Sequence, residues 1–125
     1  MSQVNIPNVK IAVIDDDLLA RDFIVTVLMY CVNRDVLSFD SGLAAWQYIK
    51  DHGSLDIIIS GIDVPGLSGF KLLSKFKKKY PEKKCILMSA DPAHEPSARD
   101  SGADAFLAKP VSVNDLFKVV ETFVV

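Results

Sequence analysis

Apolar residues along this chain gather in five short runs, and the segments between the runs have the spacing of amphipathic helices. Several of the runs are continuously apolar, which is typical of parallel strands covered on both faces. The predicted strands are Lys10–Ile14, Asp35–Phe39, Leu55–Ser60, Lys84–Ser89 and Ala105–Ala108. Their alternation with helical segments predicts an open parallel sheet with right-handed crossovers and helices on both faces.

Four regular helices are expected between and after the strands. Their predicted ranges are about Leu18–Tyr30, Ser41–Lys50, Ser68–Lys79 and Ser112–Phe123. The residues predicted to face inward from the first of them are Leu19, Phe23, Val27 and Leu28. Asp17 is the expected cap of the first helix, and Ser41 or Asp40 that of the second. The last helix opens with a sequence that resembles a capping box, from Ser112 to Asp115.

The segment after the fourth strand has a weaker helical signal. Asp91–Pro96 holds two prolines, and proline suits the first turn of a helix but not its interior. We therefore expect a long loop from Asp91 and a short helix from about Pro96 to Ser101, which Gly102 ends.

The composition indicates one ordered domain. The chain has 125 residues, half of them hydrophobic, and this is enough to bury a core. A net charge of −2 argues against a nucleic-acid-binding surface spread over the whole molecule. No apolar run approaches the ~20 residues of a membrane span. We expect a single cytoplasmic domain over 1–125, with 1–8 as an N-terminal extension, and with Cys31 and Cys85 as buried free thiols.

Polar residues stand at the ends of the predicted strands. Asp15 and Asp16 follow the first strand, and adjacent carboxylates can hold Mg²⁺ through oxygen ligands. Ser89 ends the fourth strand, and Lys109 follows the fifth and precedes Pro110, a candidate cis bond. In open parallel sheets ligands bind beyond these strand ends, so the pattern predicts a site for phosphate and a divalent metal. The alternative is that the acids cap a helix and that the lysine and serine are solvated turn residues.

These motifs resemble the receiver domain of two-component response regulators, including the single-domain chemotaxis regulators. The likeness runs from Val9 to about Phe123, and the motifs that carry it are Ile-Asp-Asp-Asp at 14–17, Val-Pro-Gly-Leu-Ser-Gly at 64–69, Met-Ser-Ala at 88–90 and Ala-Lys-Pro at 108–110. The resemblance implies a flavodoxin-like (βα)5 fold with strand order 2-1-3-4-5. It also implies a signalling domain rather than an enzyme.

The resemblance assigns a role to each residue at the strand ends. It makes Asp15 and Asp16 the metal-binding acids, Asp63 the donor of a backbone carbonyl to the metal, Ser89 and Lys109 the phosphoryl contacts and Phe106 the switch aromatic. One position departs from the pattern. The phosphoacceptor aspartate of the family stands four residues before the proline of the Pro-Gly turn, and here that residue is Gly61.

Glycine has no nucleophile, so no acyl phosphate can form at position 61. Asp63 lies two residues beyond it, past the strand end, and is not expected to replace the acceptor. Loss of a carboxylate also predicts weak or absent Mg²⁺ binding. Gly61 is compatible with an engineered null variant and with a natural pseudo-receiver.

The resemblance implies a histidine kinase or phosphotransfer protein as partner. A downstream protein would bind a face built from roughly Pro96–Ser101, Ala105–Ala108 and Ser112–Phe123, and the apolar C-terminus leaves a homodimer open. Neither direct nucleic-acid binding nor membrane binding is expected. Two alternatives stay open: a phosphorylation-independent interaction module, and a haloacid-dehalogenase-like phosphatase suggested by Asp15-x-Asp17. We interpret the lysine-rich segment from Lys75 to Lys84 as a solvated face, with docking of a partner as the alternative.

Overall fold

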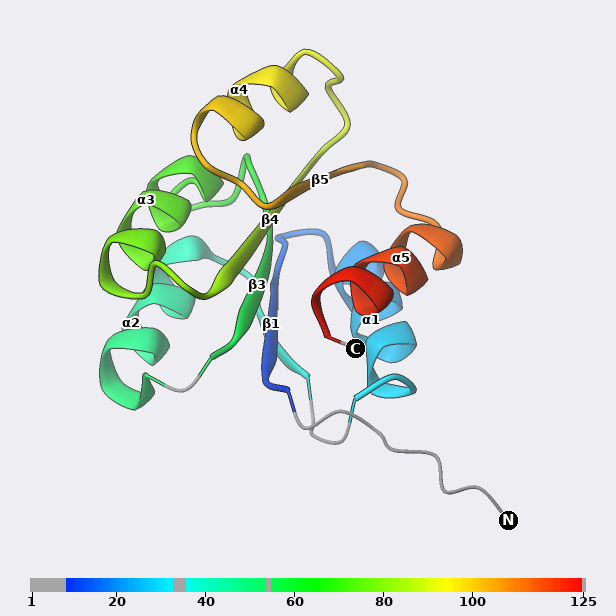
Figure 1. Cartoon of the computed structure of the whole chain (residues 1–125), viewed down its shortest axis with the longest axis horizontal. Helices are drawn as coiled ribbons and strands as arrows, with labels where there is room; N and C mark the ends of the chain where they lie inside the picture. The colour runs from blue at the N-terminus through cyan, green and yellow to red at the C-terminus, as the bar shows by residue number, and fades with distance from the viewer. Residues whose placement is uncertain (1–8, 33–35, 54, 125) are drawn as a thin grey trace.

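Five parallel strands and five helices alternate along the chain (Figure 1). The computed structural model describes residues 9–32, 36–53 and 55–124. The strands are β1 (Ile11–Ile14), β2 (Leu37–Phe39), β3 (Ile57–Gly61), β4 (Lys84–Ser89) and β5 (Ala105–Ala108). The helices are α1 (Leu18–Met29), α2 (Gly42–His52), α3 (Gly69–Lys79), α4 (His94–Asp100) and α5 (Val113–Phe123). All strand pairs are parallel and their order is β2-β1-β3-β4-β5, so the predicted flavodoxin-like fold is confirmed.

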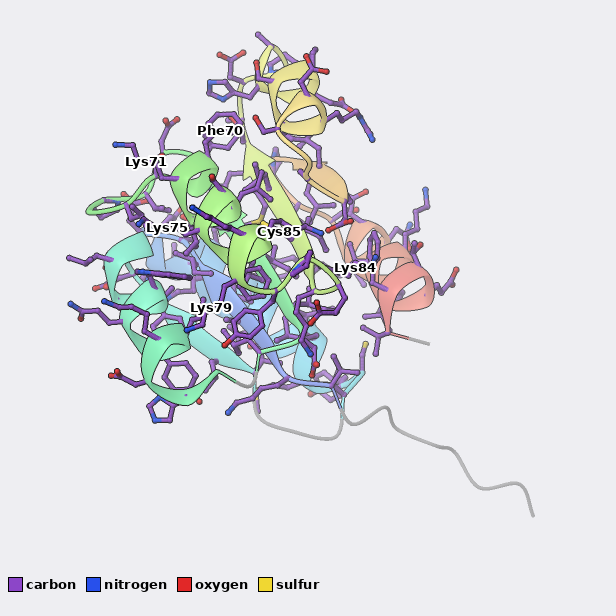
Figure 2. All side chains as sticks on the ribbon, turned by 60° about the vertical axis from the view of Figure 1, so that its left-hand side comes forward. Phe70, Lys71, Lys75, Lys79, Lys84 and Cys85 are labelled. Atoms are coloured by element: carbon purple, nitrogen blue, oxygen red, sulfur yellow. The ribbon has the colours of Figure 1, made fainter. Side chains whose placement is uncertain are left out.

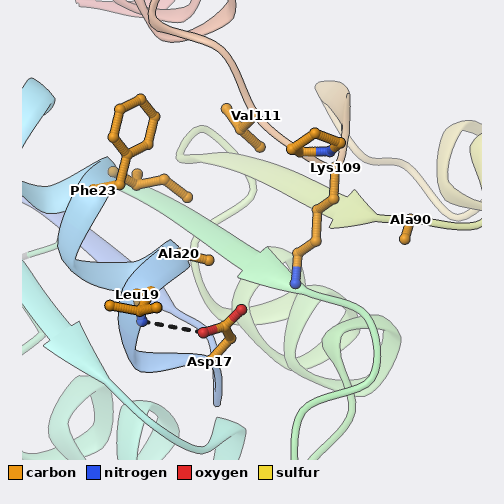
Figure 3. A pocket seen from close by; sticks show the side chains of 9 residues that line it. Asp17, Leu19, Ala20, Phe23, Ala90, Lys109 and Val111 are labelled. Carbon is orange, nitrogen blue, oxygen red and sulfur yellow. Dashed lines mark hydrogen bonds between the residues drawn. The ribbon is translucent and has the colours of Figure 1, made fainter.

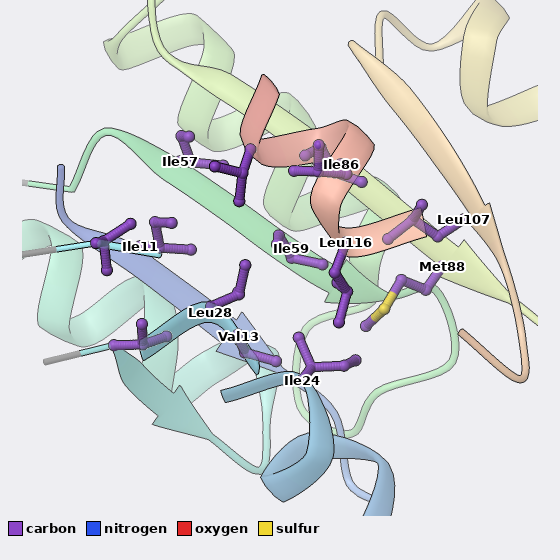
Figure 4. Close-up of a cluster of buried hydrophobic side chains, with 14 residues drawn as sticks. Ile11, Val13, Ile24, Leu28, Ile57, Ile59, Ile86, Met88, Leu107 and Leu116 are labelled. Atoms are coloured by element: carbon purple, nitrogen blue, oxygen red, sulfur yellow. The ribbon is translucent and has the colours of Figure 1, made fainter. Parts of the chain in front are cut away.

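Two hydrophobic clusters cover the two faces of the sheet. Alternate residues of each central strand point to opposite faces. Ile11, Val13, Ile57 and Ile59 pack beneath α1 and α5, as Figure 4 shows. The residues that alternate with this first set along the strands face α2 and α3. They belong to the second cluster and are Ala12, Ile14, Ile58, Cys85 and Leu87. Because both faces are covered, β1 and β3 are buried at every position, which explains why β1 and the first three residues of β3 are continuously apolar.

The predicted caps are present at the start of three helices. The Asp17 carboxylate accepts a hydrogen bond from the Leu19 amide at 3.1 Å, and the Ser41 hydroxyl accepts one from the Ala44 amide at 3.1 Å. Ser112 and Asp115 form a reciprocal capping box. Each cap satisfies amide groups that the first helical turn leaves unpaired, so these residues fix where the chain turns from strand to helix.

Two predictions about helices were wrong. α4 begins at His94 rather than near Pro96, because a proline is tolerated in a first turn whose amides have no helical partner. The prediction for α1 was wrong for two of its four residues. Leu28 is buried and Val27 packs against the core, as predicted, whereas Leu19 is 80% exposed and Phe23 is 40% exposed, and the other buried residue of α1 is Ile24. α1 is apolar around much of its circumference, so spacing alone did not identify the buried stripe.

Both cysteines are free, but only one is buried. Cys85 lies in the core, as predicted, whereas Cys31 is only partly buried, so that prediction was half right. No described helix is long and apolar enough to cross a membrane.

Candidate functional site

The carboxyl ends of β1, β3, β4 and β5 bring the predicted polar residues to one edge of the sheet. Gly61 is the last residue of β3 and pairs with Met88 in β4. The Lys109 amide donates to the Ser89 carbonyl at 2.9 Å, which ties the residue after β5 to the end of β4. The peptide bond between Lys109 and Pro110 is cis, as the sequence suggested.

Gly61 lies beside the ammonium group of Lys109. A β-carbon placed on Gly61 would be 3.7 Å from Lys109 Nζ, 3.2 Å from Val64 Cγ1 and 3.8 Å from the Ile14 carbonyl oxygen. A side chain at this position is therefore admissible after a shift of a few tenths of an ångström by Val64. The position is buried, and its nearest charged neighbour is a cation.

Lys109 forms an ion pair with Asp15 across the same edge. The Asp15 side chain is completely buried, and its Oδ2 atom lies 2.7 Å from Lys109 Nζ. Lys109 is the ion-pair partner of Oδ2, and this atom has no hydrogen bond within the described residues. Oδ1 accepts a hydrogen bond from the Asp17 amide at 3.0 Å. A buried carboxylate needs a compensating charge, and Lys109 supplies it.

Ser89 is held by a residue that the sequence did not reveal as part of the site. Its hydroxyl is 2.7 Å from Nδ1 of His94, and it accepts a hydrogen bond from the Asp91 amide at 3.0 Å. The His94 ring in turn packs edge-on against Phe70 at 6.4 Å between centroids. His94 stands five residues after Ser89, and the first turn of α4 carries it back over the strand end; the two prolines obscured that turn.

An apolar pocket of about 400 Å³ adjoins the ion pair. Leu19 and Phe23 of α1 form one wall, and Val111 and the side chain of Lys109 form the other (Figure 3). Leu19 and Phe23 are the two α1 residues that were predicted to face the core but do not. Their exposure therefore gives this edge of the molecule an apolar rim beside its charged centre.

The carboxylates present do not make an ordinary magnesium site. Among the described residues there is no group of three or more acidic, histidine or cysteine side chains placed to hold a metal. Asp16 and Asp63 are exposed, and the buried oxygen of Asp15 already faces an ammonium ion. A divalent cation would have to displace Lys109 from Asp15, and no carboxylate extends from Gly61 to complete its ligands.

The sequence profile of the response regulator receiver domain matches residues 11–121. The chain belongs to this family. Receiver domains serve two-component signalling and generally bind Mg²⁺ and exchange phosphate with kinases or phosphotransfer proteins.

Relatives of this receiver domain occur in longer proteins. It is 30% identical over 116 residues to the two-component response regulator-like protein PRR37 of Oryza sativa subsp. indica, covering 86% of this chain and 15% of that protein. It is 30% identical over 113 residues to the DNA-binding transcriptional regulator NtrC of Azospirillum brasilense, covering 89% of this chain and 23% of the relative. The chain therefore spans a small part of these proteins.

Solved receiver domains share the fold over nearly the whole chain. One from Clostridium thermocellum superposes with a TM-score of 0.81 at 28% identity, covering 91% of this chain and 92% of the other. The receiver domain of NtrX from Brucella abortus gives a TM-score of 0.79 at 26% identity, covering 90% and 95% of the two chains.

Four predicted site residues of the receiver domain lie at the sheet edge: Asp15, Gly61, Ser89 and Lys109. Phe106 is partly buried and packs against the cluster beneath α2 and α3. Asp16 and Asp63 are exposed. The roles that the family resemblance assigns to all of these residues stay predictions.

Proposed function

We propose that this chain is a receiver domain that cannot accept phosphate at the usual position, because Gly61 stands where the family has its phosphoacceptor aspartate. The observation that carries the proposal is the place of Gly61: it ends β3, precedes Pro65 by four residues and lies next to Lys109. A carboxylate at this point would face the ammonium group, as a phosphoacceptor requires. Glycine offers no atom to bond phosphorus.

The two side chains near Gly61 that would contact a phosphoryl group, Lys109 and Ser89, are held by other residues of the chain. Lys109 is already neutralised by Asp15, and the Ser89 hydroxyl is already bonded to His94 and to the Asp91 amide. In a phosphorylated receiver the lysine and the hydroxyl would contact the phosphoryl oxygens. Here each has a partner within the chain, so the domain holds one arrangement without a phosphoryl group.

This arrangement favours constitutive binding of a partner as the biological role. The partner surface that we propose is the face formed by α4, β5 and α5, to which His94 is connected through α4. A kinase or phosphotransfer protein would then dock without transferring phosphate. The similarity to a protein named response regulator-like, PRR37, supports a receiver domain that acts without phosphate transfer.

A phosphatase reaction with Asp15 as nucleophile is disfavoured. The Asp15 side chain is completely buried. One of its oxygens accepts a hydrogen bond from the Asp17 amide, and the other faces Lys109. No carboxylate oxygen is left open for attack on a phosphate ester. We accordingly propose a signalling domain rather than an enzyme.

Phosphorylation by acetyl phosphate tests the proposal. The wild-type protein and the Gly61→Asp variant are incubated with Mg²⁺ and acetyl phosphate, and intact mass spectrometry measures addition of a phosphoryl group. We expect addition to Gly61→Asp only. Addition to the wild-type protein that disappears in Asp63→Asn would make Asp63 the acceptor and overturn the proposal. An unmodified Gly61→Asp variant would also contradict it, because the pocket would then lack more than the carboxylate.

A further inference from the structure

The basic segment around α3 divides into paired and unpaired lysines. Lys77 lies 2.7 Å from the Asp104 carboxylate, and Lys83 lies 2.8 Å from that of Asp56. Lys84 is 3.9 Å from Asp104. The remaining four lysines of the helix are exposed, and none has an acidic partner within residues 9–32, 36–53 and 55–124; they are Lys71, Lys75, Lys78 and Lys79. We call these four residues the α3 lysine face.

The four side chains share one side of the helix. Lys71, Lys75 and Lys78 are three or four residues apart and lie on the side away from the buried Leu73 and Phe76. Lys79, next to Lys78, lies at the edge of that side. Figure 2 shows Lys71, Lys75 and Lys79 along the outer side of α3. Lys75 also lies over the ring of Trp46 of α2, with Nζ 5.7 Å from the ring centroid. The face spans about 12 Å along the helix axis.

This placement does not serve the stability of α3. Like charges three and four residues apart repel each other on a helix surface. Lys71 is in the first turn, where the helix dipole disfavours a cation and where no acidic residue is present. The dipole favours only Lys78 and Lys79, near the C-terminal end. The arrangement is therefore better explained by something outside the helix that carries negative charge.

We propose that the α3 lysine face docks a short acidic segment of a partner protein. Taking the four positive charges away from the net charge of −2 leaves −6 on the rest of the chain. A duplex, a long single strand or an anionic membrane would extend past the face, and the net negative charge of the rest of the chain disfavours that overlap. A segment of three or four carboxylates fits the face alone.

The composition of the face agrees with a protein partner. It has no exposed apolar side chain along α3 that would insert into lipid, and Lys75 lies over one face of the partly buried Trp46 ring, where a base would have to compete with it. This docking surface is separate from the strand-end site. Failure of Gly61→Asp to take up phosphate would therefore leave the docking proposal intact. Failure of peptide binding to the α3 lysine face would likewise leave the proposal about Gly61 intact.

Binding of a synthetic peptide tests the proposal. The probe is a helical peptide with glutamates spaced four residues apart, added to isotope-labelled full chain while amide chemical shifts are followed by NMR. The variant Lys71→Gln/Lys78→Gln removes two charges that make no contact within the described part of the chain. The matched control is Lys50→Gln/Lys118→Gln, which removes two exposed charges from α2 and α5. Thermal unfolding verifies that both variants are folded.

We expect the peptide to shift amides of α3 and to bind about tenfold more weakly to Lys71→Gln/Lys78→Gln, with little change in the control. Equal losses in both variants would overturn the proposal, because binding would then follow net charge. Shifts outside α3 would also overturn it. Tighter α3 binding of a single-stranded oligonucleotide or of vesicles rich in phosphatidylserine, measured with the same variants, would replace the acidic protein segment with that partner.

Discussion

The imidazole of His94 and the hydroxyl of Ser89 are 2.7 Å apart, at the point where β4 leads into α4. This hydrogen bond joins the residue that would contact a phosphoryl group to the first residue of a helix in the proposed partner surface. It also occupies the serine hydroxyl. A ligand at the sheet edge that bonds to the Ser89 hydroxyl would therefore compete with His94, the first residue of α4.

Removal of the His94 ring should strengthen binding of a phosphoryl analogue. In the Gly61→Asp background, His94→Ala frees the Ser89 hydroxyl to bond to beryllofluoride, and one hydrogen bond contributes about 0.5–1.5 kcal/mol, or roughly two- to tenfold in affinity. Titration with beryllofluoride and Mg²⁺, followed by NMR, measures the change. His52→Ala is the matched control, since that ring stacks on Tyr48. Weaker binding after His94→Ala would mean that His94 presents the hydroxyl instead of withholding it.

Lys109→Met should destabilise the fold. The substitution leaves the carboxylate of Asp15 buried without a compensating charge, and breaking such a pair costs about 3 kcal/mol. Urea unfolding measures the free energy of unfolding. Asp15→Asn/Lys109→Met removes both charges and should recover part of the loss. A double variant less stable than Lys109→Met would show that the Asp15 carboxylate stabilises the fold without the lysine.

Magnesium should have little effect on the wild-type protein. Lys109 holds the position that a cation would take beside Asp15, and Gly61 supplies no ligand. We expect millimolar Mg²⁺ to leave the thermal midpoint of the wild-type protein unchanged and to raise that of Gly61→Asp, because a bound ligand stabilises the native state. Ca²⁺ in place of Mg²⁺ controls for a general effect of divalent salt. A clear rise in the wild-type midpoint with Mg²⁺ would contradict the prediction.

Gly69→Ala should destabilise the protein, although alanine is ordinarily the better helix residue. A β-carbon at Gly69 would meet the Gly61 carbonyl oxygen at 2.4 Å and the Ile62 α-carbon at 2.9 Å, and both atoms belong to the backbone. Relief requires α3 to move away from the end of β3, at a cost of about 1–3 kcal/mol. Urea unfolding measures it, with Ser74→Ala on the exposed side of α3 as control. A gain in stability would show that α3 has room to shift.

The sheet was predictable because both of its faces are covered. Short, continuous apolar runs such as Ile11–Ile14 are typical of strands buried on two sides, and the capping residues Asp17, Ser41 and Ser112 marked where three helices begin. Parallel strands place their carboxyl ends at one edge, so Asp15 and Lys109 were expected to be close. Their ion pair at 2.7 Å agrees with that expectation.

Other features depend on tertiary packing that the sequence pattern does not encode. α1 is apolar on more than one side, so only its contact with the sheet selects Ile24 and Leu28 over Leu19 and Phe23. His94 joins the site because α4 starts two residues before Pro96. Proline is tolerated at several positions of a first turn, so Pro96 did not define where the helix begins. The pairing of Lys77, and not of the other α3 lysines, likewise depends on where Asp104 lies.

The two cysteines should react with thiol reagents at very different rates. Burial, aided by the negative charge of Asp104, raises the pKa of the Cys85 thiol far above its ordinary value, so this thiol stays protonated at pH 8. Because the thiolate is the nucleophile, Cys85 should react only after unfolding, whereas the partly exposed Cys31 should react in the native state. Ellman's reagent should therefore titrate one thiol in buffer and two in urea, and Cys31→Ser should abolish the native reaction. A native Cys31→Ser protein that still reacts would mean that β4 opens readily, and the core on which the sheet-edge site rests would be far less rigid than its packing indicates.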